Sequence, residues 1–184
     1  MKQLNLGCWH RNIPGFINID ICDMPHIDYK NSIDYLPMFE DESIDLIYSS
    51  HSFEYFDRIE AIRVLEEWRR VLKKGAILRL AVPDFDKLIE IYSITNRLET
   101  ILGPLFGRML IDTETGKQSL YHKTTYSFNS LEKILLDNGF RDIKRYNWQE
   151  TIHKDYDDHS QAYFPHMDKE NGILISLNIE ATKI

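Results

Sequence analysis

Apolar segments of strand type and amphipathic segments of helix type alternate along the first half of this chain. The most regular helix pattern spans 58–73. Short apolar runs predict strands at 3–6, 16–20, 26–29, 44–49 and 77–82. Because strands that alternate with helices are typical of parallel sheets covered by helices, the sequence predicts a doubly wound, Rossmann-like α/β fold.

The helix pattern at 58–73 carries its own start and stop signals. Its apolar residues recur at helical spacing, namely Ile59, Ile62, Leu65, Trp68 and Leu72. Asp57 and Glu60 form a capping box before it, and Gly75 is the expected end. We expect the apolar stripe to pack against the sheet as ordinary helix core.

The second half of the chain continues with helices and ends with strands. Three helices are expected: over 84–96, over 98–110, and from a cap at Asn129 and Glu132 to an end at Asn138-Gly139. Late strands follow at 142–148 and 173–181, and one antiparallel late strand is expected in a mostly parallel sheet. The long polar, aromatic loop between them predicts a functional role. We expect residues 1–184 to form a single domain, since this length suits one core.

Composition argues against several classes of protein. The net charge is −7 and no run of lysine and arginine stands out, which argues against nucleic-acid binding. No apolar stretch approaches the ~18 residues of a membrane span, and residues 1–7 have the pattern of a strand rather than of a signal peptide. Cys8 and Cys22 are too few for a disulfide framework and lack metal-ligand spacing. We therefore expect a cytoplasmic protein with reduced thiols.

Three features end neighbouring strands of the predicted sheet. Gly7 ends the first strand, Asp20 ends the second, and Ser49-Ser50-His51 ends the fourth. In doubly wound sheets the ligand binds at the carboxyl ends of the strands, near the topological switch point. A glycine turn allows close approach of the backbone, and a carboxylate can accept hydrogen bonds from two ribose hydroxyls. The pattern predicts a nucleotide-like cofactor at this edge.

The spacing of these features distinguishes between cofactors. A dinucleotide site requires G-x-G-x-x-G and an acid ~20 residues further on. Here the next glycine after Gly7 is Gly15, Asp20 follows Gly7 by 13 residues, and no Walker motif is present. A cofactor with a ribose but no phosphates fits better, and a nicotinamide-dependent oxidoreductase is the weaker alternative.

Several ordered motifs resemble those of class I S-adenosylmethionine-dependent methyltransferases. Leu4 to Cys8 and Pro14 to Asp20 match the first two motifs. The later motifs are matched by Leu36-Pro37, Asp41 to Glu54, Glu66 to Pro83, His122, Phe128 and Leu131 to Phe140. The resemblance covers nearly the whole chain and implies the Rossmann-like methyltransferase fold. The subgroup that the chain resembles comprises small predicted methyltransferases often linked to cell-surface polysaccharide synthesis.

This resemblance implies positions for the cofactor. S-adenosylmethionine would bind with its ribose on Asp20 and with Ile21 packed on its adenine. Ser32 and Ile33 would lie near the adenine edge. The methionine end would be bordered by Gly7, Cys8, Ser49 and His51.

Two positions depart from the family's pattern. Trp9 stands where the family usually has glycine, and a bulky residue at positive φ costs roughly 1–2 kcal/mol. The Trp9 ring could instead cover the site and stack on the adenine or the sulfonium, a contact worth about 0.5–2 kcal/mol. Ser32 stands where the family usually has an acid, with Asp34 two residues away. The family's covering N-terminal helix has no counterpart here, so the site could be open, or a partner subunit, as in a homodimer, could complete it.

Methyl transfer needs an aligned nucleophile and, for a hydroxyl acceptor, a base. Histidine suits the base role because its pKa lies near neutrality. We expect His122 to act as the base or to orient the substrate, and His51 is the second candidate. Substrate contacts are expected from Tyr121, His122, His159, Gln161 and His166. No metal is expected, since the histidines and acids of the late loop lack the spacing of a standard metal site.

The sequence thus predicts a small methyltransferase that acts on a small molecule, and the resemblance suggests a sugar or glycan precursor. An alternative is a binding or regulatory module that retains the fold and the cofactor but not catalysis. Trp9 and Ser32 keep this alternative open. Binding of S-adenosylmethionine without transfer of its methyl group would favour it.

Overall fold

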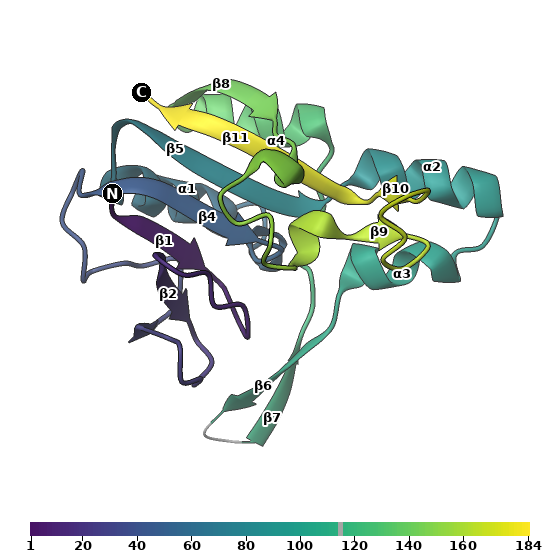
Figure 1. Ribbon diagram of the computed structural model, residues 1–184, viewed down its shortest axis with the longest axis horizontal. Helices are drawn as coiled ribbons and strands as arrows, with labels where there is room; N and C mark the ends of the chain where they lie inside the picture. The colour runs from purple at the N-terminus through teal and green to yellow at the C-terminus, as the bar shows by residue number, and fades with distance from the viewer. Residues whose placement is uncertain (114–115) are drawn as a thin grey trace.

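A computed structural model describes residues 1–113 and 116–184 of the chain. Its centre is a seven-stranded sheet in the order β3-β2-β1-β4-β5-β11-β8 (Figure 1). The strands are β1 (Gln3–Leu6), β2 (Ile17–Asp20), β3 (Tyr29–Lys30), β4 (Ile44–Ser50), β5 (Leu72–Pro83), β8 (Phe140–Arg145) and β11 (Ser176–Lys183). β11 runs antiparallel to both neighbours, and the pairs among β1 to β5 are parallel. The predicted α/β sheet with one antiparallel late strand is confirmed.

β1 lies between β2 and β4, so the strand order reverses at β1. The ends of these three strands carry Gly7, Asp20 and His51, and we call this region the carboxyl edge. Ligands of such sheets bind at this reversal point because the connections on its two sides diverge there. The topology therefore places the glycine, acid and histidine signals at one edge of the sheet.

The described residues form four α-helices: α1 (Glu60–Val71), α2 (Phe85–Thr95), α3 (Glu99–Phe106) and α4 (Phe128–Asp137). The expected capping box before α1 is present, since Asp57 accepts from the Glu60 amide at 2.9 Å and Glu60 accepts from the Asp57 amide at 2.8 Å. The expected end at Gly75 is wrong. α1 ends at Val71 because Leu72 already pairs with β4, and Gly75 lies within β5.

The start of α4 also differs from the prediction. Ser127 accepts from the Ser130 amide at 3.3 Å, and the Ser130 hydroxyl accepts from the Ser127 amide at 2.9 Å. This pair forms the capping box, so Asn129 and Glu132 lie inside the helix. The helix ends at Asp137, in agreement with the predicted stop at Asn138-Gly139.

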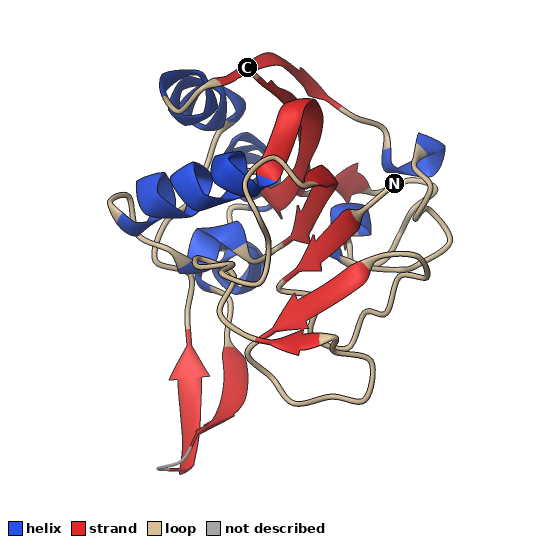
Figure 2. Ribbon diagram, turned by 90° about the vertical axis from the view of Figure 1, so that its left-hand side faces the viewer, coloured by secondary structure: helices blue, strands red, loops and turns tan. Residues whose placement is uncertain are grey.

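The two faces of the sheet are covered differently, and Figure 2 shows the long helices gathered on one side of it, with only short helical turns on the other. Trp68 of α1 and Leu131 of α4 share one core cluster with Leu6 and Leu80 of the sheet. Leu65 and Trp68 are buried, as the predicted apolar stripe of α1 requires. Ile59 and Ile62, which the prediction placed in the same stripe, are exposed. The opposite face carries a small cluster without helical residues, formed by Ile13, Phe16, Leu46, Tyr48 and Ile77.

That opposite face is largely polar, and the late loop covers part of it. Asn5 donates to Asn18 at 2.9 Å, and the Tyr48 hydroxyl donates to Asp158 at 2.5 Å. The His153 ring lies 4.0 Å from the Tyr48 ring. The loop between β8 and β11 therefore packs on the sheet through hydrogen bonds and rings rather than through an apolar helix.

A hairpin follows α3 where a longer helix was predicted. α3 ends at Phe106 because Gly107 has φ +53°, and β6 (Met109–Thr113) pairs with β7 (Gly116–Leu120). Figure 1 shows this hairpin projecting from the body of the molecule. The third strand is also displaced from 26–29, because Tyr29 and Lys30 are the residues that pair with β2.

Shorter elements complete the described chain. They are the 3₁₀ turns η1 (Phe53–Tyr55), η2 (Trp148–Glu150) and η3 (His159–Gln161), and the strand pair β9 (Tyr163–Phe164) and β10 (Ile173–Leu174). In the part of the chain that the structure describes, no helix has the length and apolar character needed to cross a membrane.

Candidate functional site

Gly7 closes the turn after β1. Its φ is +67°, and a Cβ atom there would stand 2.2 Å from the hydroxyl oxygen of Ser52. That hydroxyl donates to the Gly7 carbonyl at 3.0 Å. Glycine is required because the left-handed backbone and the contact with Ser52 both exclude a side chain.

Asp20 fixes the same turn from the end of β2. Its buried carboxylate accepts hydrogen bonds from the amides of Trp9 and Cys22, both at 2.8 Å. A carboxylate offers about four acceptor positions on its two oxygens, so each oxygen keeps a free lone pair. Asp20 therefore holds the backbone of the turn and can accept further hydrogen bonds from a ligand.

Two apolar side chains next to Asp20 are open to solvent. Trp9 is 40% exposed and Ile21 is 41% exposed. Trp9 has φ +43°, the left-handed conformation for which glycine is better suited, and its ring lies edge-on to His10 at 4.4 Å. Cys8 is buried, and burial together with the charge of Asp20 raises the pKa of its thiol to about 12.

Ser32 and Ile33 lie at different depths. The Ser32 hydroxyl donates to the Asp34 carboxylate, and both side chains belong to exposed residues. Ile33 is buried beneath the Gly7 turn, where its Cδ1 would be 3.5 Å from a Cβ atom on Gly7. Its carbonyl accepts from the Trp68 indole at 2.7 Å, which ties the turn to α1.

β4 ends in Ser49 and Ser50, and His51 follows it. Ser49 is completely buried, and neither serine hydroxyl has a hydrogen-bond partner among residues 1–113 and 116–184. His51 has φ +51°, and its Nε2 lies 3.0 Å from the Ser176 hydroxyl oxygen. That hydroxyl itself donates to Asn178 at 2.9 Å, so its oxygen accepts from Nε2–H of His51. Nδ1 of the neutral ring is therefore unprotonated.

Glu54 lies between His51 and His122 and is fully buried. Its Oε1 is 3.6 Å from Nδ1 of His51 and 3.6 Å from Nε2 of His122. Within the described chain, neither carboxyl oxygen has a hydrogen-bond partner. Burial raises the pKa of Glu54 to about 8, so the carboxyl group is mostly protonated at neutral pH.

His122 approaches Glu54 from the other side. Its Nδ1 lies 3.1 Å from the Pro104 carbonyl, which can only accept, so Nδ1 carries the proton and Nε2 is free toward Glu54. Burial lowers the pKa of His122 and holds the pKa of His51 well below its usual range. We call His51, Glu54 and His122 the buried trio. Its two ring nitrogens and its carboxyl group share one proton, so the trio can take up another.

The other residues predicted to contact a substrate lie in different environments. His159, in η3, is exposed, and its ring lies 5.2 Å from the His51 ring. Tyr121 and His166 are also exposed. Gln161 is buried and donates to the Lys154 carbonyl at 3.0 Å while accepting from Lys169 at 2.7 Å, so it stabilises the late loop itself.

Two residues at this edge carry no role in the sequence prediction. Glu54 follows His51 by three residues across the turn η1, and this His-x-x-Glu spacing is the signal that could have identified it. Arg11 follows the Gly7 turn, and its amide donates to the Cys8 carbonyl at 2.8 Å. The structure thus brings His51, His122 and His159 together and adds Glu54 and Arg11 to the site.

The hairpin β6–β7 reaches the β2 side of the same edge. Burial and the charge of Asp20 raise the pKa of the Cys22 thiol to about 11, and the charge of Asp112 adds to this effect. Asp112 lies on β6, so the hairpin stands close to the end of β2. His122 follows the hairpin and packs directly against Gly107. A Cβ atom on residue 107 would stand 2.2 Å from Nε2 of His122, so a side chain there would clash with the ring.

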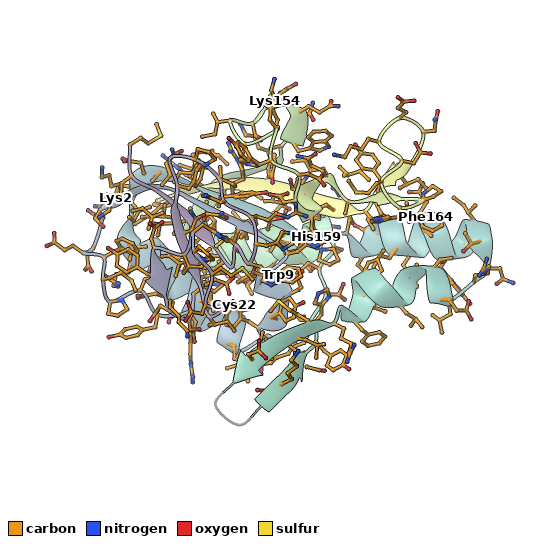
Figure 3. The ribbon with its side chains drawn as sticks, turned by 60° about the horizontal axis from the view of Figure 1, so that its bottom comes forward. Lys2, Trp9, Cys22, Lys154, His159 and Phe164 are labelled. Atoms are coloured by element: carbon orange, nitrogen blue, oxygen red, sulfur yellow. The ribbon has the colours of Figure 1, made fainter. Side chains whose placement is uncertain are left out.

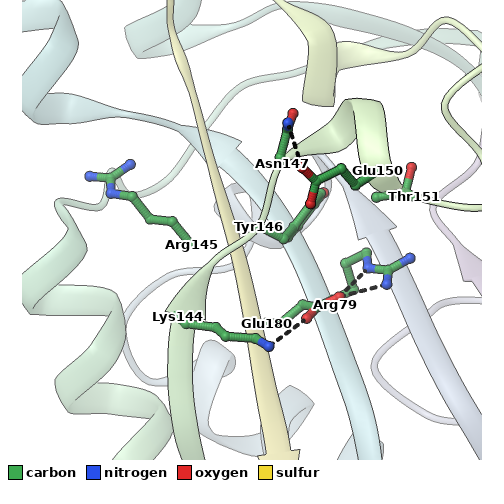
Figure 4. A pocket seen from close by; sticks show the side chains of 8 residues that line it. All are labelled: Arg79, Lys144, Arg145, Tyr146, Asn147, Glu150, Thr151 and Glu180. Carbon is green, nitrogen blue, oxygen red and sulfur yellow. Dashed lines mark hydrogen bonds and ion pairs between the residues drawn. The ribbon is translucent and has the colours of Figure 1, made fainter.

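A separate cavity of about 290 Å³ lies away from the carboxyl edge, between β8 and the start of the late loop (Figure 4). Three of its charged groups are paired with one another, since Glu180 contacts Arg79 at 2.5 Å and Lys144 at 3.7 Å. The cavity is lined by Arg79, Lys144, Arg145, Tyr146, Asn147, Glu150, Thr151 and Glu180. None of the predicted site residues lines it.

Comparisons with known proteins agree with the geometry. Residues 16–80 match the sequence model of a family described as Methyltransferase domain. No curated protein sequence matches the chain significantly. Several hundred solved chains match it in structure.

Three solved structures illustrate the likeness. An S-adenosylmethionine-dependent methyltransferase from Methanosarcina mazei is 17% identical, with a TM-score of 0.59 over 100% of this chain and 92% of that one. One from Thermotoga maritima is 16% identical, with a TM-score of 0.60 over 100% and 82%. The 1,6-didemethyltoxoflavin-N1-methyltransferase of Burkholderia thailandensis, with 1,6-didemethyltoxoflavin and S-adenosylhomocysteine bound, is 12% identical, with a TM-score of 0.55 over 98% and 70%. The chain has the Rossmann-like fold of these methyltransferases.

Proposed function

We propose that this protein is an S-adenosylmethionine-dependent methyltransferase that acts on a small molecule. The observation that carries the proposal is the position of Ser52. Its hydroxyl lies against Gly7, and its backbone lies between His51 and Glu54. The turn that suits a nucleoside and the trio that can take up a proton are therefore adjacent.

The residues at the carboxyl edge fit this cofactor. Asp20 has free lone pairs for ribose hydroxyls, and Trp9 and Ile21 offer exposed apolar surface for an adenine or a thioether chain. The turn lacks the glycines that bring a backbone close to a pyrophosphate. S-adenosylmethionine, when bound, supplies a methyl group activated on a sulfonium. Gly7, Cys8, Ser32, Ile33 and Ser49 complete the proposed binding set.

The buried trio would remove the proton that a hydroxyl or ammonium acceptor must lose. The side chains of His51 and His122 are 11% and 7% exposed, so each ring still reaches the surface, whereas Glu54 does not. In this proposal one histidine takes the proton, and the Glu54 carboxyl group, with Oε1 at 3.6 Å from both rings, accepts a hydrogen bond from the resulting imidazolium. A base of this kind contributes about 10²–10⁴-fold to a rate.

Narrower proposals rest on the sequence alone, through its motifs, its length or its cysteine content. They are a sugar or glycan precursor as acceptor, a role in polysaccharide synthesis, a cytoplasmic location, a single domain over residues 1–184, and a homodimer that completes the site. Tyr121 is exposed and precedes His122 in the sequence. His166 is exposed, and its charge acts on His159. Both remain proposed substrate contacts.

Calorimetry with S-adenosylmethionine, S-adenosylhomocysteine and NAD tests the proposal. We expect both sulfur compounds to bind and NAD not to bind. Asp20→Asn should weaken S-adenosylhomocysteine binding at least tenfold, because the amide no longer offers two acceptor oxygens to the ligand. Asp28→Asn is the matched control: Asp28 also accepts a backbone amide, from Asn18 at 2.8 Å, and should change the affinity less than twofold.

Two outcomes would contradict the proposal in different ways. Tight NAD binding without a response to either sulfur compound would favour the oxidoreductase. Tight binding of both sulfur compounds, with no formation of S-adenosylhomocysteine from any of a broad panel of hydroxyl and amine acceptors, would favour the non-catalytic binding module.

A further inference from the structure

Arg11 differs from every other arginine in the described residues. The other arginines that are withdrawn from solvent, Arg70 and Arg79, have carboxylate partners at 2.7–2.8 Å and 2.5 Å. The remaining arginines without a carboxylate partner are exposed. Arg11 alone is half-buried and, within residues 1–113 and 116–184, has neither an ion pair nor a side-chain hydrogen bond. A half-buried guanidinium without a protein partner keeps all five of its N–H donors free for a ligand.

The position of Arg11 is fixed by its backbone. Its amide donates to the Cys8 carbonyl at 2.8 Å, and its carbonyl accepts from the Asn5 side chain at 3.0 Å. Arg11 therefore belongs to the turn that follows Gly7, at the carboxyl edge. A substitution of its side chain leaves both of these backbone contacts in place.

Two histidines lie in the same region as Arg11. His10 precedes it in the chain, and Ile13, two residues after it, packs in one cluster with Tyr48, whose hydroxyl donates to Asp158 next to His159. Consistent with this placement, desolvation and the positive charge of Arg11 lower the pKa of both His10 and His159. Trp9 packs on His10 at 4.4 Å, and Figure 3 shows Trp9 and His159 in the same part of that view. We call Arg11, His10 and His159 the Arg11 cluster.

The acids near this cluster are already paired. Asp158 accepts from the Tyr48 hydroxyl at 2.5 Å and from the Ser160 amide at 2.8 Å. Asp157 pairs with Lys169 at 3.0 Å. No group of three or more ligating side chains in the described residues is arranged to hold a metal ion, so the histidines are not explained by a metal. In a chain of net charge −7, the Arg11 guanidinium is thus a positive group that has no ion pair among the described residues.

We propose that the Arg11 cluster binds an anionic group, a carboxylate or a phosphate, of the methyl acceptor. Arginine binds both groups with its planar fork of N–H donors, and neutral imidazoles add further donors. The inference rests on the proposed function for its link to methyl transfer. It assigns the acceptor to the class of small acidic hydroxyl or amine compounds.

The geometry connects this subsite to the reaction. The His159 ring lies 5.2 Å from the His51 ring, and His51 contacts Glu54 at 3.6 Å. An anion held by Arg11 and His159 therefore places the rest of its molecule beside the buried trio. The subsite would orient the acceptor, and the trio would receive its proton.

Titration with inorganic phosphate and with acetate tests the proposal. The titration is monitored by NMR of the histidine rings, at constant ionic strength and with saturating S-adenosylhomocysteine. We expect saturable shifts of the His10 and His159 resonances. Arg11→Gln should weaken binding at least tenfold. Arg63→Gln, which removes the same charge from the exposed side of α1, should change it less than twofold. The tighter of the two probes identifies the acceptor's group as a phosphate or a carboxylate.

Three outcomes would overturn the inference. The first is the lack of a saturable shift with either probe. The second is an equal loss of binding in Arg11→Gln and Arg63→Gln, which would indicate general charge screening. The third is competition between the anion and S-adenosylhomocysteine, which would assign the cluster to the cofactor's own carboxylate. If the anions bind but S-adenosylhomocysteine does not, the proposed function and the acceptor role fail while the anion site stands.

Discussion

The turn after β1 and the buried trio lie side by side, but their polar groups are in opposite states. In the turn, Asp20 accepts two backbone amides at 2.8 Å, and the Ser52 hydroxyl is hydrogen-bonded to Gly7. In the trio, both oxygens of the fully buried Glu54 lack a partner in the described residues. A buried polar group without a partner costs about 1–3 kcal/mol. The turn is thus a preformed support, whereas the trio carries a cost that stability alone does not explain.

Glu54→Gln should produce the largest effect and tests whether that cost serves catalysis. The amide is similar in volume and can donate to the free nitrogens of His51 and His122, so no base remains. We expect the rate of methyl transfer to fall about 10²–10⁴-fold. The free energy of unfolding should stay the same or rise. S-adenosylhomocysteine formation with a panel of acidic hydroxyl and amine compounds measures the rate.

Glu66→Gln is the matched control for this substitution. Glu66 is exposed on α1, so the same loss of charge should leave the rate within twofold. A Glu54→Gln enzyme with unchanged rate would show that the trio is structural. The comparison between the two regions would then lose its functional meaning.

The turn was easier to predict from the sequence than the trio because its contacts are local. Gly7, Asp20 and the strands that carry them belong to one short segment, and their spacing is what predicts the cofactor chemistry. The sheet, its antiparallel strand and α1 follow from hydrophobic periodicity in the same way. The predicted end of α1 is wrong because two signals compete there. Gly75 is a helix stop signal, but Leu72 already pairs with β4 and ends the helix earlier.

The trio depends on contacts between distant segments. His51 and His122 were both identified as candidates, but Glu54, which joins them, carries no signal beyond its spacing from His51. The cover of the opposite sheet face was missed for the same reason, since Tyr48 and Asp158 are 110 residues apart in the chain. The helix predicted over 98–110 ends early because Gly107 has a left-handed backbone, and the hairpin β6–β7 follows. The difference thus depends on the backbone of a single residue.

The pH dependence of stability should show the second-largest effect. The pKa of Glu54 is about 8 in the folded protein and 4.5 as a free side chain. Between these values the folded state binds the extra proton, so the free energy of unfolding falls as pH rises from about 4.5 to 8. The expected fall is roughly 3–5 kcal/mol. Denaturant unfolding across this range measures it.

Glu54→Gln also provides the reference curve for this experiment. The lowered pKa values of His51 and His122 have the opposite effect, because the folded protein releases their protons first and stability rises up to about pH 6.5. Both proteins contain these histidines, so the difference between their curves isolates Glu54. If the two free energies of unfolding differ by a constant amount from pH 4.5 to 8, Glu54 is ionised throughout this range. The trio then has no shared proton.

Trp9→Gly should have the smallest effect and tests whether the turn is only a support. Glycine relieves the strain of φ +43° but gains freedom in the unfolded state, so the free energy of unfolding should change by no more than ~1 kcal/mol. The amide of residue 9 still donates to Asp20. A ring that contacts the sulfonium would contribute about 0.5–2 kcal/mol, so S-adenosylmethionine should bind about 2- to 30-fold more weakly.

The comparison of two ligands locates the Trp9 ring. It packs on His10, which lies near His159 and hence toward the trio, so we expect it at the methyl-transfer end. S-adenosylhomocysteine has no positive charge on its sulfur and should lose less affinity than S-adenosylmethionine in Trp9→Gly, while Trp9→Phe should restore part of the difference. An equal loss for both ligands would place the ring on the adenine instead, and no loss for either would make Trp9 a strained turn residue that contributes nothing to binding.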